Sequence, residues 1–341
     1  MKFLFLCKNV YNCDESALFY RAIPDSTHAL RNEKVFGHKK LKDRVSILFC
    51  ANMAGTDKMP PLVIGHSKTP RAFRGVMNLP LAYEHNKNAW MTTFIFAGWL
   101  RKWNQRLKKQ RRKIALILDN VSSHVGHDPL ECIKLIYLPP NTTSLIQPLD
   151  QGIIRAFKAY YRRSIIQQII HALENSSDDG VKSIAKKISL LDAMHNVKVA
   201  WNEITTDCVV NCFRKAGFCE ALFCSEEIND ILIANAPHGL ALEEWETYTA
   251  MDDEEQCNGN VSDTEICITA QSSSCQAIQI QEDRQPPSAK EVLDALGTLR
   301  RLYESCANAD YEPFYSLDRD VKKLLSTNLT QKKITDFFYK I

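Results

Sequence analysis

The chain has 341 residues, of which 45% are hydrophobic and 24% are charged. This composition is typical of a folded domain with one large core and excludes a disordered or fibrous chain. Twelve cysteines without a CxxC pair argue against a secreted, disulfide-stapled domain. The apolar N-terminal run of about five residues is too short for a secretory signal, and no run approaches the roughly 18 residues of a membrane span.

The small net charge of +3 hides a division between the two halves of the chain. Residues 1–170 contain 27 Lys or Arg and 11 Asp or Glu, a balance of +16, so the remainder contains 16 and 29, a balance of −13. A basic half is typical of a protein that binds a polyanion, and an acidic half is typical of a solvated or regulatory tail.

Three short apolar segments precede the first clear helix. Residues 10–13 are apolar apart from Asn12 and lead into Asp14, while residues 45–51 and 61–64 have strand character around a turn. This order predicts an antiparallel meander. From Thr93 onward the spacing predicts an amphipathic helix, with a stripe that is more often core than a base-stacking surface: Phe96, Trp99, Leu100, Trp103 and Leu107.

The segment 113–158 organises the rest of the domain. Residues 114–118 are a continuous apolar run, which predicts a strand buried on both faces, with Asp119 at its end. A second such run follows at 133–138, and the helix expected from Pro148 onward has Asp150 in its first turn. Antiparallel strands followed by strand, helix, strand and helix indicate an α/β fold, a mixed sheet flanked by helices.

Asp14, Asp119 and Asp150 are therefore carboxylates carried by three different elements at one edge of the sheet. Mg²⁺ prefers oxygen ligands, so the three together predict a metal site, although a single Asp at such a position is usually a cap or turn residue. Glu15 is expected on the opposite face of an extended strand and outside the metal shell. His124 is either a site-edge residue that orients DNA or water, or a satisfied loop histidine.

Three motifs in this order carry a family resemblance: Asn12-Cys13-Asp14-Glu15-Ser16, Leu118-Asp119-Asn120 with His124, and Gln147-Pro148-Leu149-Asp150-Gln151-Gly152. Together they resemble the DDE endonuclease domain of pogo/Tigger-type transposases, a group that includes Tigger transposable element-derived proteins, jerky and centromere protein B. The resemblance covers roughly residues 9–218. It implies a ribonuclease-H-like fold and metal-dependent phosphodiester cleavage and strand transfer, with two Mg²⁺ or Mn²⁺ ions on Asp14, Asp119 and Asp150.

The resemblance and the composition divide the chain into four parts. Residues 1–218 are expected to form the endonuclease domain and 219–250 a helical extension. Residues 251–287, rich in acidic and small polar residues, are predicted to be a disordered linker, and 288–341 a C-terminal helix and tail. Family members carry N-terminal helix-turn-helix modules for DNA binding, and this sequence starts almost at the first catalytic strand, so we expect those modules to be missing from it.

The C-terminal tail contains a second motif, in which Gln331, Ile334, Phe337 and Phe338 have the spacing of the peptide that binds the sliding clamp, proliferating cell nuclear antigen. One 3₁₀ turn would gather the three apolar side chains into a plug for a hydrophobic pocket. The alternative is a tail that packs on its own domain.

Basic side chains flank the predicted site and are candidates for phosphate contacts or, in the run 108–113, for nuclear import: Lys108, Lys109, Arg111, Arg112, Arg155 and Lys158. A solvated helix end explains that run equally well. Three functions remain open: a nuclear, DNA-binding endonuclease derived from a transposon, a domesticated DNA- or chromatin-binding protein without catalysis, and a clamp-binding protein that uses the fold as a scaffold.

Overall fold

The computed structural model describes residues 6–24, 41, 43–125, 129–140, 142–175, 180–218, 237, 241–258, 289–307 and 309–328. Within these, a six-stranded mixed sheet has the order β4-β3-β2-β1-β5-β6. The strands are β1 (Val10–Phe19), β2 (Arg44–Asn52), β3 (Leu62–Gly65), β4 (Ala82–His85), β5 (Ile114–Leu118) and β6 (Ile133–Tyr137).

The first three strands form the predicted antiparallel meander, and β5 and β6 then add parallel to β1. β4 adds parallel to β3 at the other edge. The prediction of an α/β fold, a mixed sheet flanked by helices, is confirmed.

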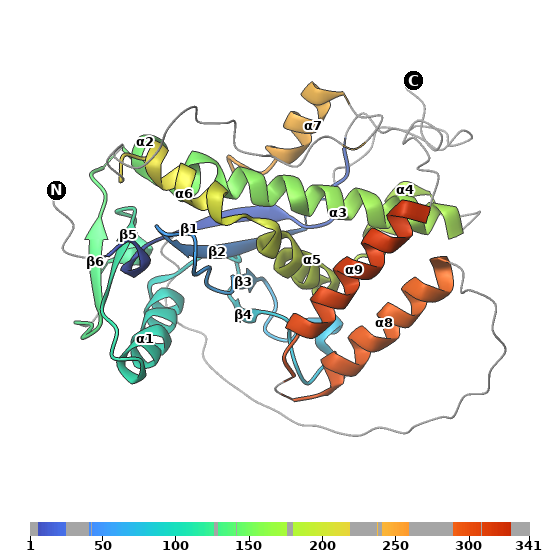
Figure 1. Cartoon of the computed structure of the whole chain (residues 1–341), viewed down its shortest axis with the longest axis horizontal. Coiled ribbons are helices and arrows are strands. Elements are labelled where there is room, and N and C mark those ends of the chain that lie inside the picture. The colour runs from blue at the N-terminus through green and yellow to red at the C-terminus, as the bar shows by residue number, and fades with distance from the viewer. Residues whose placement is uncertain are drawn as a thin grey trace.

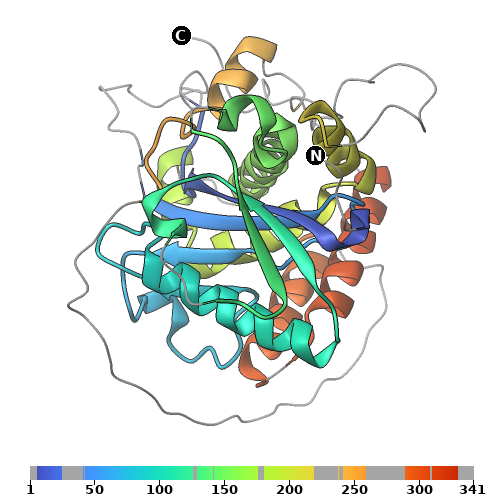
Figure 2. The same cartoon turned by 90° about the vertical axis from the view of Figure 1, so that its left-hand side faces the viewer.

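Helices cover both faces of the sheet (Figures 1 and 2). One face is covered by α1 (Thr93–Lys109), and the other by α3 (Ile154–Asn175), α5 (Leu190–Glu203) and α6 (Thr206–Lys215). The remaining helices are α2 (Thr143–Ile146), α4 (Val181–Lys187), α7 (Leu242–Thr249), α8 (Ala289–Ser305) and α9 (Glu312–Asn328). Short turns η1 (Cys7–Asn9), η2 (Arg71–Phe73), η3 (Ser122–His124) and η4 (Leu149–Ile153) complete the described elements.

The alternation of β1 decides which side chains enter which core. Val10 and Leu18 pack in the core beneath α3, whereas Tyr11 and Cys13 pack beneath α1. Because side chains alternate along a strand, Asp14 lies on the α3 side and Glu15 on the α1 side. All five residues of β5 are buried, as a central strand covered on both faces requires.

The predicted amphipathic helix is α1, which begins at the Thr92 cap, where the hydroxyl accepts a hydrogen bond from Ile95 N at 3.3 Å. Four of the five residues of its predicted stripe are buried in the core: Phe96, Leu100, Trp103 and Leu107. Among the helices described, none combines the length and apolar character that crossing a membrane requires.

A helical pair, α8 and α9, packs beside α5 in its own small cluster, in which Leu296, Tyr311, Phe314 and Tyr315 are buried. The sequence predicted one helix in residues 288–341, and the second, α9, is an addition. The motif residues Gln331, Ile334, Phe337 and Phe338 lie outside the described residues.

Candidate functional site

Strand register brings the first two predicted aspartates to the same level. β1 and β5 pair in parallel with Asn12 opposite Ile117. Two residues further along each strand are Asp14 and Asp119, so the register places both at the carboxyl end of β5. Neighbouring strands are about 4.8 Å apart, which puts the two carboxylates within a short distance of each other.

The third aspartate, Asp150, lies in η4, where the chain enters α3. The sequence predicted a regular first helical turn here, but Gly152 has a φ of 144° and breaks the helix. Glycine adopts this conformation without the steric cost that a Cβ would add. Asp150 is exposed, whereas Asp14 is only 9% exposed, so the site opens to solvent on the η4 side.

One buried amide holds the three aspartate-bearing segments together. Asn12 donates from Nδ2 to the Ile117 carbonyl at 3.0 Å, and its Oδ1 accepts from Leu149 N at 2.9 Å. Each of these three residues lies one or two positions before one of the aspartates. Because Asn12 is fully buried, neither hydrogen bond is open to competition from water.

Negative charge accumulates at this edge. Burial, followed by the charges of Asp150 and Asp119, raises the pKa of Asp14 well above its usual range. Partial loss of solvent raises the pKa of Asp150 as well, although a hydrogen bond from Asp14 lowers it. Burial and the neighbouring like charges therefore favour the protonated form of this pair more than in an isolated carboxyl group.

His124 links the edge to the opposite face of β1. Its Nδ1 lies 2.6 Å from Asp119 Oδ1 and its Nε2 lies 3.0 Å from Glu15 Oε1. Burial by itself lowers the pKa of His124, but the charge of Glu15 and the hydrogen bonds to both carboxylates outweigh it and raise the pKa to about 10. The imidazolium therefore donates at both nitrogens and fixes the orientation of Asp119.

An acidic strap, defined here as residues 250–258, covers the α3 side of the site. Asp252 accepts a hydrogen bond from Phe19 N at 2.8 Å and forms ion pairs with Lys158 and Arg162. All three charged side chains are at most 2% exposed. The Lys158 ammonium lies 2.7 Å from Asp252 Oδ1.

The far end of the strap lies beside β1. Met91 N donates to the Cys257 carbonyl at 2.7 Å, and Cys257 Sγ donates to the Glu15 carbonyl at 3.5 Å. The predicted linker 251–287 therefore begins with eight residues that are held on the domain. Residues 259–287 lie outside the described residues.

The structure brings together Asp14, Asp119 and Asp150, with His124 at the edge, as the sequence predicts. It uses the predicted phosphate contacts differently, because Lys158 is buried against Asp252, Arg155 pairs with Glu246 at 3.1 Å and Lys108 pairs with Glu131 at 2.7 Å. Sequence reasoning missed Asn12 and the part that Glu15 plays through His124. The polar Asn12 in an otherwise apolar strand was the one available signal.

The donor chemistry of this edge fits a hard divalent cation. Three carboxylates converge there, and no Lys or Arg of the described chain forms an ion pair with any of them. Within the described residues, however, no three His, Cys, Asp or Glu side chains are already spaced to hold a metal ion. Burial and like charges raise the pKa values of Asp14 and Asp150, so we expect a cation bound beside them to lower these values again.

Residues 42–213, which make up half of the chain, match the model of the DDE superfamily endonuclease family. The chain therefore belongs to that family. It is 29% identical over 324 residues to "Tigger transposable element-derived protein 4" of Mus musculus, covering 87% of this chain and 61% of that protein. It is 30% identical over 213 residues to "Major centromere autoantigen B" of Homo sapiens, covering 62% and 34%. It is 31% identical over 247 residues to "Jerky protein homolog" of Homo sapiens, covering 68% and 42%.

The chain thus spans about three fifths, or less, of the length of these relatives. Among solved structures, the "Mos1 transposase paired-end complex with left transposon end" overlaps 62% of this chain and 56% of that chain. Its identity is 9% and its TM-score is 0.30, which is too weak a similarity to support an inference. The predicted kinship with Tigger-derived proteins, jerky and centromere protein B is confirmed by the curated relatives and the family model.

Proposed function

We propose that this chain is a nuclear, metal-dependent DNA phosphodiesterase of the transposase type. The observation that carries the proposal is the convergence of Asp14, Asp119 and Asp150 from β1, β5 and η4 in the absence of a described Lys or Arg partner. A structural network would neutralise such charge, whereas a site for a divalent cation keeps it available.

The three aspartates would hold two Mg²⁺ or Mn²⁺ ions. The ions, when bound, would activate the attacking water or 3′-hydroxyl and stabilise the leaving oxygen. A bound cation would lower the raised pKa values of Asp14 and Asp150 and favour their ionised forms. His124 keeps Asp119 in one orientation and, with Glu15, excludes water from the α1 side.

The test is nicking of supercoiled plasmid DNA by the purified chain with Mg²⁺ or Mn²⁺, beside Asp119→Asn. Asp207→Asn is a matched control, because Asp207 is an exposed aspartate in the first turn of α6. We expect nicking by the wild type and the control and none by Asp119→Asn. A second readout without DNA is the melting temperature, which Mn²⁺ should raise in the wild type but not in Asp119→Asn. Equal behaviour of all three proteins in both assays would contradict the proposal.

The alternative is a domesticated DNA- or chromatin-binding protein without catalysis. It predicts DNA binding that weakens steeply with salt and no metal-dependent cleavage. The intact set of three aspartates favours the enzyme. Binding together with a metal-induced rise in melting temperature, but without cleavage, would favour the alternative.

The C-terminal motif supports a second proposal, binding to the sliding clamp through Gln331, Ile334, Phe337 and Phe338. The support is the sequence pattern alone. We expect the full chain to bind purified proliferating cell nuclear antigen in surface plasmon resonance and the double variant Phe337→Ala, Phe338→Ala to lose that binding. Equal binding by both would contradict it. If clamp binding survived removal of residues 1–250 and the intact chain had no affinity for DNA, the protein would be a clamp-binding protein that uses the endonuclease fold only as a scaffold.

A further inference from the structure

Two lysines lie at the end of β1 and β5 that is opposite the aspartates. Lys8 lies in η1, directly before β1, Lys113 directly precedes β5, and both line one cavity. Lys113 and Asp119 are six residues apart, about 20 Å along an extended strand. The two ends of this strand pair therefore have opposite charge.

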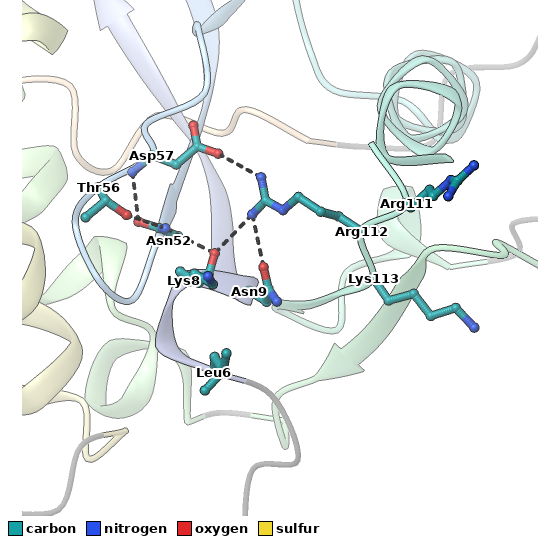
Figure 3. Close-up of a pocket in the computed structure, with 9 residues that line it drawn as sticks. All are labelled: Leu6, Lys8, Asn9, Asn52, Thr56, Asp57, Arg111, Arg112 and Lys113. Carbon is teal, nitrogen blue, oxygen red and sulfur yellow. Dashed lines mark hydrogen bonds and ion pairs between the residues drawn. The ribbon is translucent and has the colours of Figure 1, made fainter. Parts of the chain in front are cut away.

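A cavity of about 630 Å³ lies at the lysine end, shown in Figure 3. Four of its nine lining residues are basic and one is acidic: Lys8, Arg111, Arg112 and Lys113, and Asp57. Polar side chains of Asn9, Asn52 and Thr56 complete most of the wall. The cavity is open to solvent and lies at the edge of the sheet opposite the three aspartates.

Arg112 is fixed in place as part of the wall. Its Nη2 donates to the Lys8 carbonyl at 3.2 Å, to Asn9 Oδ1 at 3.1 Å and to the Tyr11 hydroxyl at 3.1 Å. The Asp57 carboxylate lies 3.9 Å from Arg112 Nη1 and accepts a 2.5 Å hydrogen bond from the Tyr11 hydroxyl. The one acidic group of the cavity is therefore engaged by Tyr11 and Arg112.

The other three basic residues that line the cavity are free to bind a ligand. Lys8, Arg111 and Lys113 are exposed, and none of them forms an ion pair with another described residue. Figure 3 shows the Arg112 side chain pointing toward Asp57, Lys8 and Asn9, whereas the side chains of Arg111 and Lys113 point away from that group. Arg111 has a φ of 52°, in the left-handed region that favours glycine at the end of a helix. The chain thus holds an arginine at the rim at a position where glycine would be less strained.

We propose that this cavity, which we call the basic pocket, binds the sugar–phosphate backbone of DNA as a second contact, separate from the aspartate edge. A phosphodiester supplies the negative charge and acceptor oxygens that the lysines and the arginine lack. At 3.4 Å per base pair, 20 Å corresponds to about six base pairs, so the pocket and the aspartates contact different phosphates. The inference rests on the proposed DNA binding and extends it.

The test is binding of a fluorescein-labelled 30-base-pair duplex to the full chain, followed by anisotropy between 50 and 200 mM salt in EDTA. The pocket variant is Arg111→Gly with Lys113→Gln. The control is Lys68→Gln with Arg74→Gln, two exposed basic residues outside the pocket. We expect the slope of log K against log salt to become shallower by about 2 in the pocket variant, from about 0.9 per lost contact, and to stay unchanged in the control.

Folding is checked separately, because Arg111→Gly relieves the left-handed backbone and should leave the melting temperature unchanged or higher. An unchanged slope in the pocket variant, or an equal loss in the control, overturns the pocket while the wild type still binds DNA. A wild type that does not bind DNA overturns both proposals. Pocket-dependent binding by a chain that fails the nicking test leaves the pocket standing and overturns only the nuclease.

Discussion

Two buried histidines occupy similar networks with opposite electrostatics. His124 lies between the carboxylates of Glu15 and Asp119, and their charge raises its pKa to about 10. His195 on α5 lies 2.9 Å from Glu304 and 2.9 Å from the Tyr315 hydroxyl. Burial, together with the charge of a nearby arginine, lowers the pKa of His195 even though Glu304 raises it.

The difference lies in what neutralises the acids. Beside His195, Arg300 forms ion pairs with Glu304 and Asp192, both at 2.8 Å, so both acids share one permanent cation. Beside His124, the histidine is the one described cation that pairs with either Glu15 or Asp119. We infer that acids paired with a permanent arginine hold the α8–α9 pair on the domain, whereas acids whose one described cation is a histidine, beside the further carboxylates of Asp14 and Asp150, mark a functional site.

The largest loss of stability should come from removing a buried carboxylate that is paired with basic side chains. Asp252→Asn leaves the buried Arg162 without its ion-pair partner and leaves Lys158 with only the half-exposed Asp253. We expect the free energy of unfolding to fall by about 3–5 kcal/mol, the usual result of removing one partner of a buried ion pair. Urea denaturation measures it. Asp294→Asn is the control, because Asp294 is an exposed aspartate on α8 outside this network, and it should cost under about 0.5 kcal/mol. Equal losses would show that Asp252 is no more important than a surface acid.

The neutral side chain of Asn12 links the three segments that carry the aspartates. Substitution of Asn12 should therefore cause the next largest loss of stability. Asn12→Ala leaves the buried Leu149 N–H and one hydrogen bond of the Ile117 carbonyl unmade. We expect a loss of about 2–4 kcal/mol, from about 1–3 kcal/mol for each unsatisfied group, and loss of metal-dependent nicking. Ser16→Ala, on the same strand, is the control. Full nicking by Asn12→Ala would contradict the role of Asn12 as the link.

The sequence was sufficient for features that depend on local pattern and failed where distant segments meet. The continuous apolar run predicted β5 from Ile114 to Leu118 without error. Asp14 was expected to follow a short strand, whereas β1 continues through it to Phe19, because β1 pairs with β2 along that length. The bridge from His124 to Glu15 joins residues 109 positions apart, and no periodicity encodes it. Likewise, Lys158 has the sequence position of an exposed helical lysine, and its burial depends on the acidic strap about 95 residues later.

Removing a buried carboxylate that has no basic partner among the described residues should raise the stability of the protein. The raised pKa of Asp14 means that its ionised form is disfavoured in the folded state, so the charge costs stability above the ordinary carboxyl pKa. Asp14→Asn should therefore raise the stability of the metal-free protein by about 0.5–2 kcal/mol, while Mn²⁺ no longer raises the melting temperature. Urea denaturation in EDTA measures the change in the free energy of unfolding of the metal-free protein. A destabilised Asp14→Asn would place Asp14 among the structural acids.

The two histidines themselves should give the smallest and most direct contrast, in the pH dependence of stability. The folded pKa of His124 is raised from 6.5 to about 10. Its contribution is complete below pH 6.5 and is lost as the pH rises toward 10. The folded pKa of His195 is lowered, so its neutral form is favoured and stability is lost as the pH falls below 6.5. Each slope is limited to one proton, about 1.4 kcal/mol per pH unit.

Urea denaturation in EDTA from pH 5 to pH 10 measures both slopes. His124→Gln should flatten the alkaline side of the profile and His195→Gln the acid side, each leaving the other side unchanged. Asp14 also destabilises the protein as the pH rises, so the slope assigned to His124 is the difference between the wild type and His124→Gln. If both variants flattened the same side, the two histidines would not differ in which protonation state the folded protein favours. The cation that pairs with the acids would then no longer distinguish the aspartate edge from the structural network beside α8 and α9.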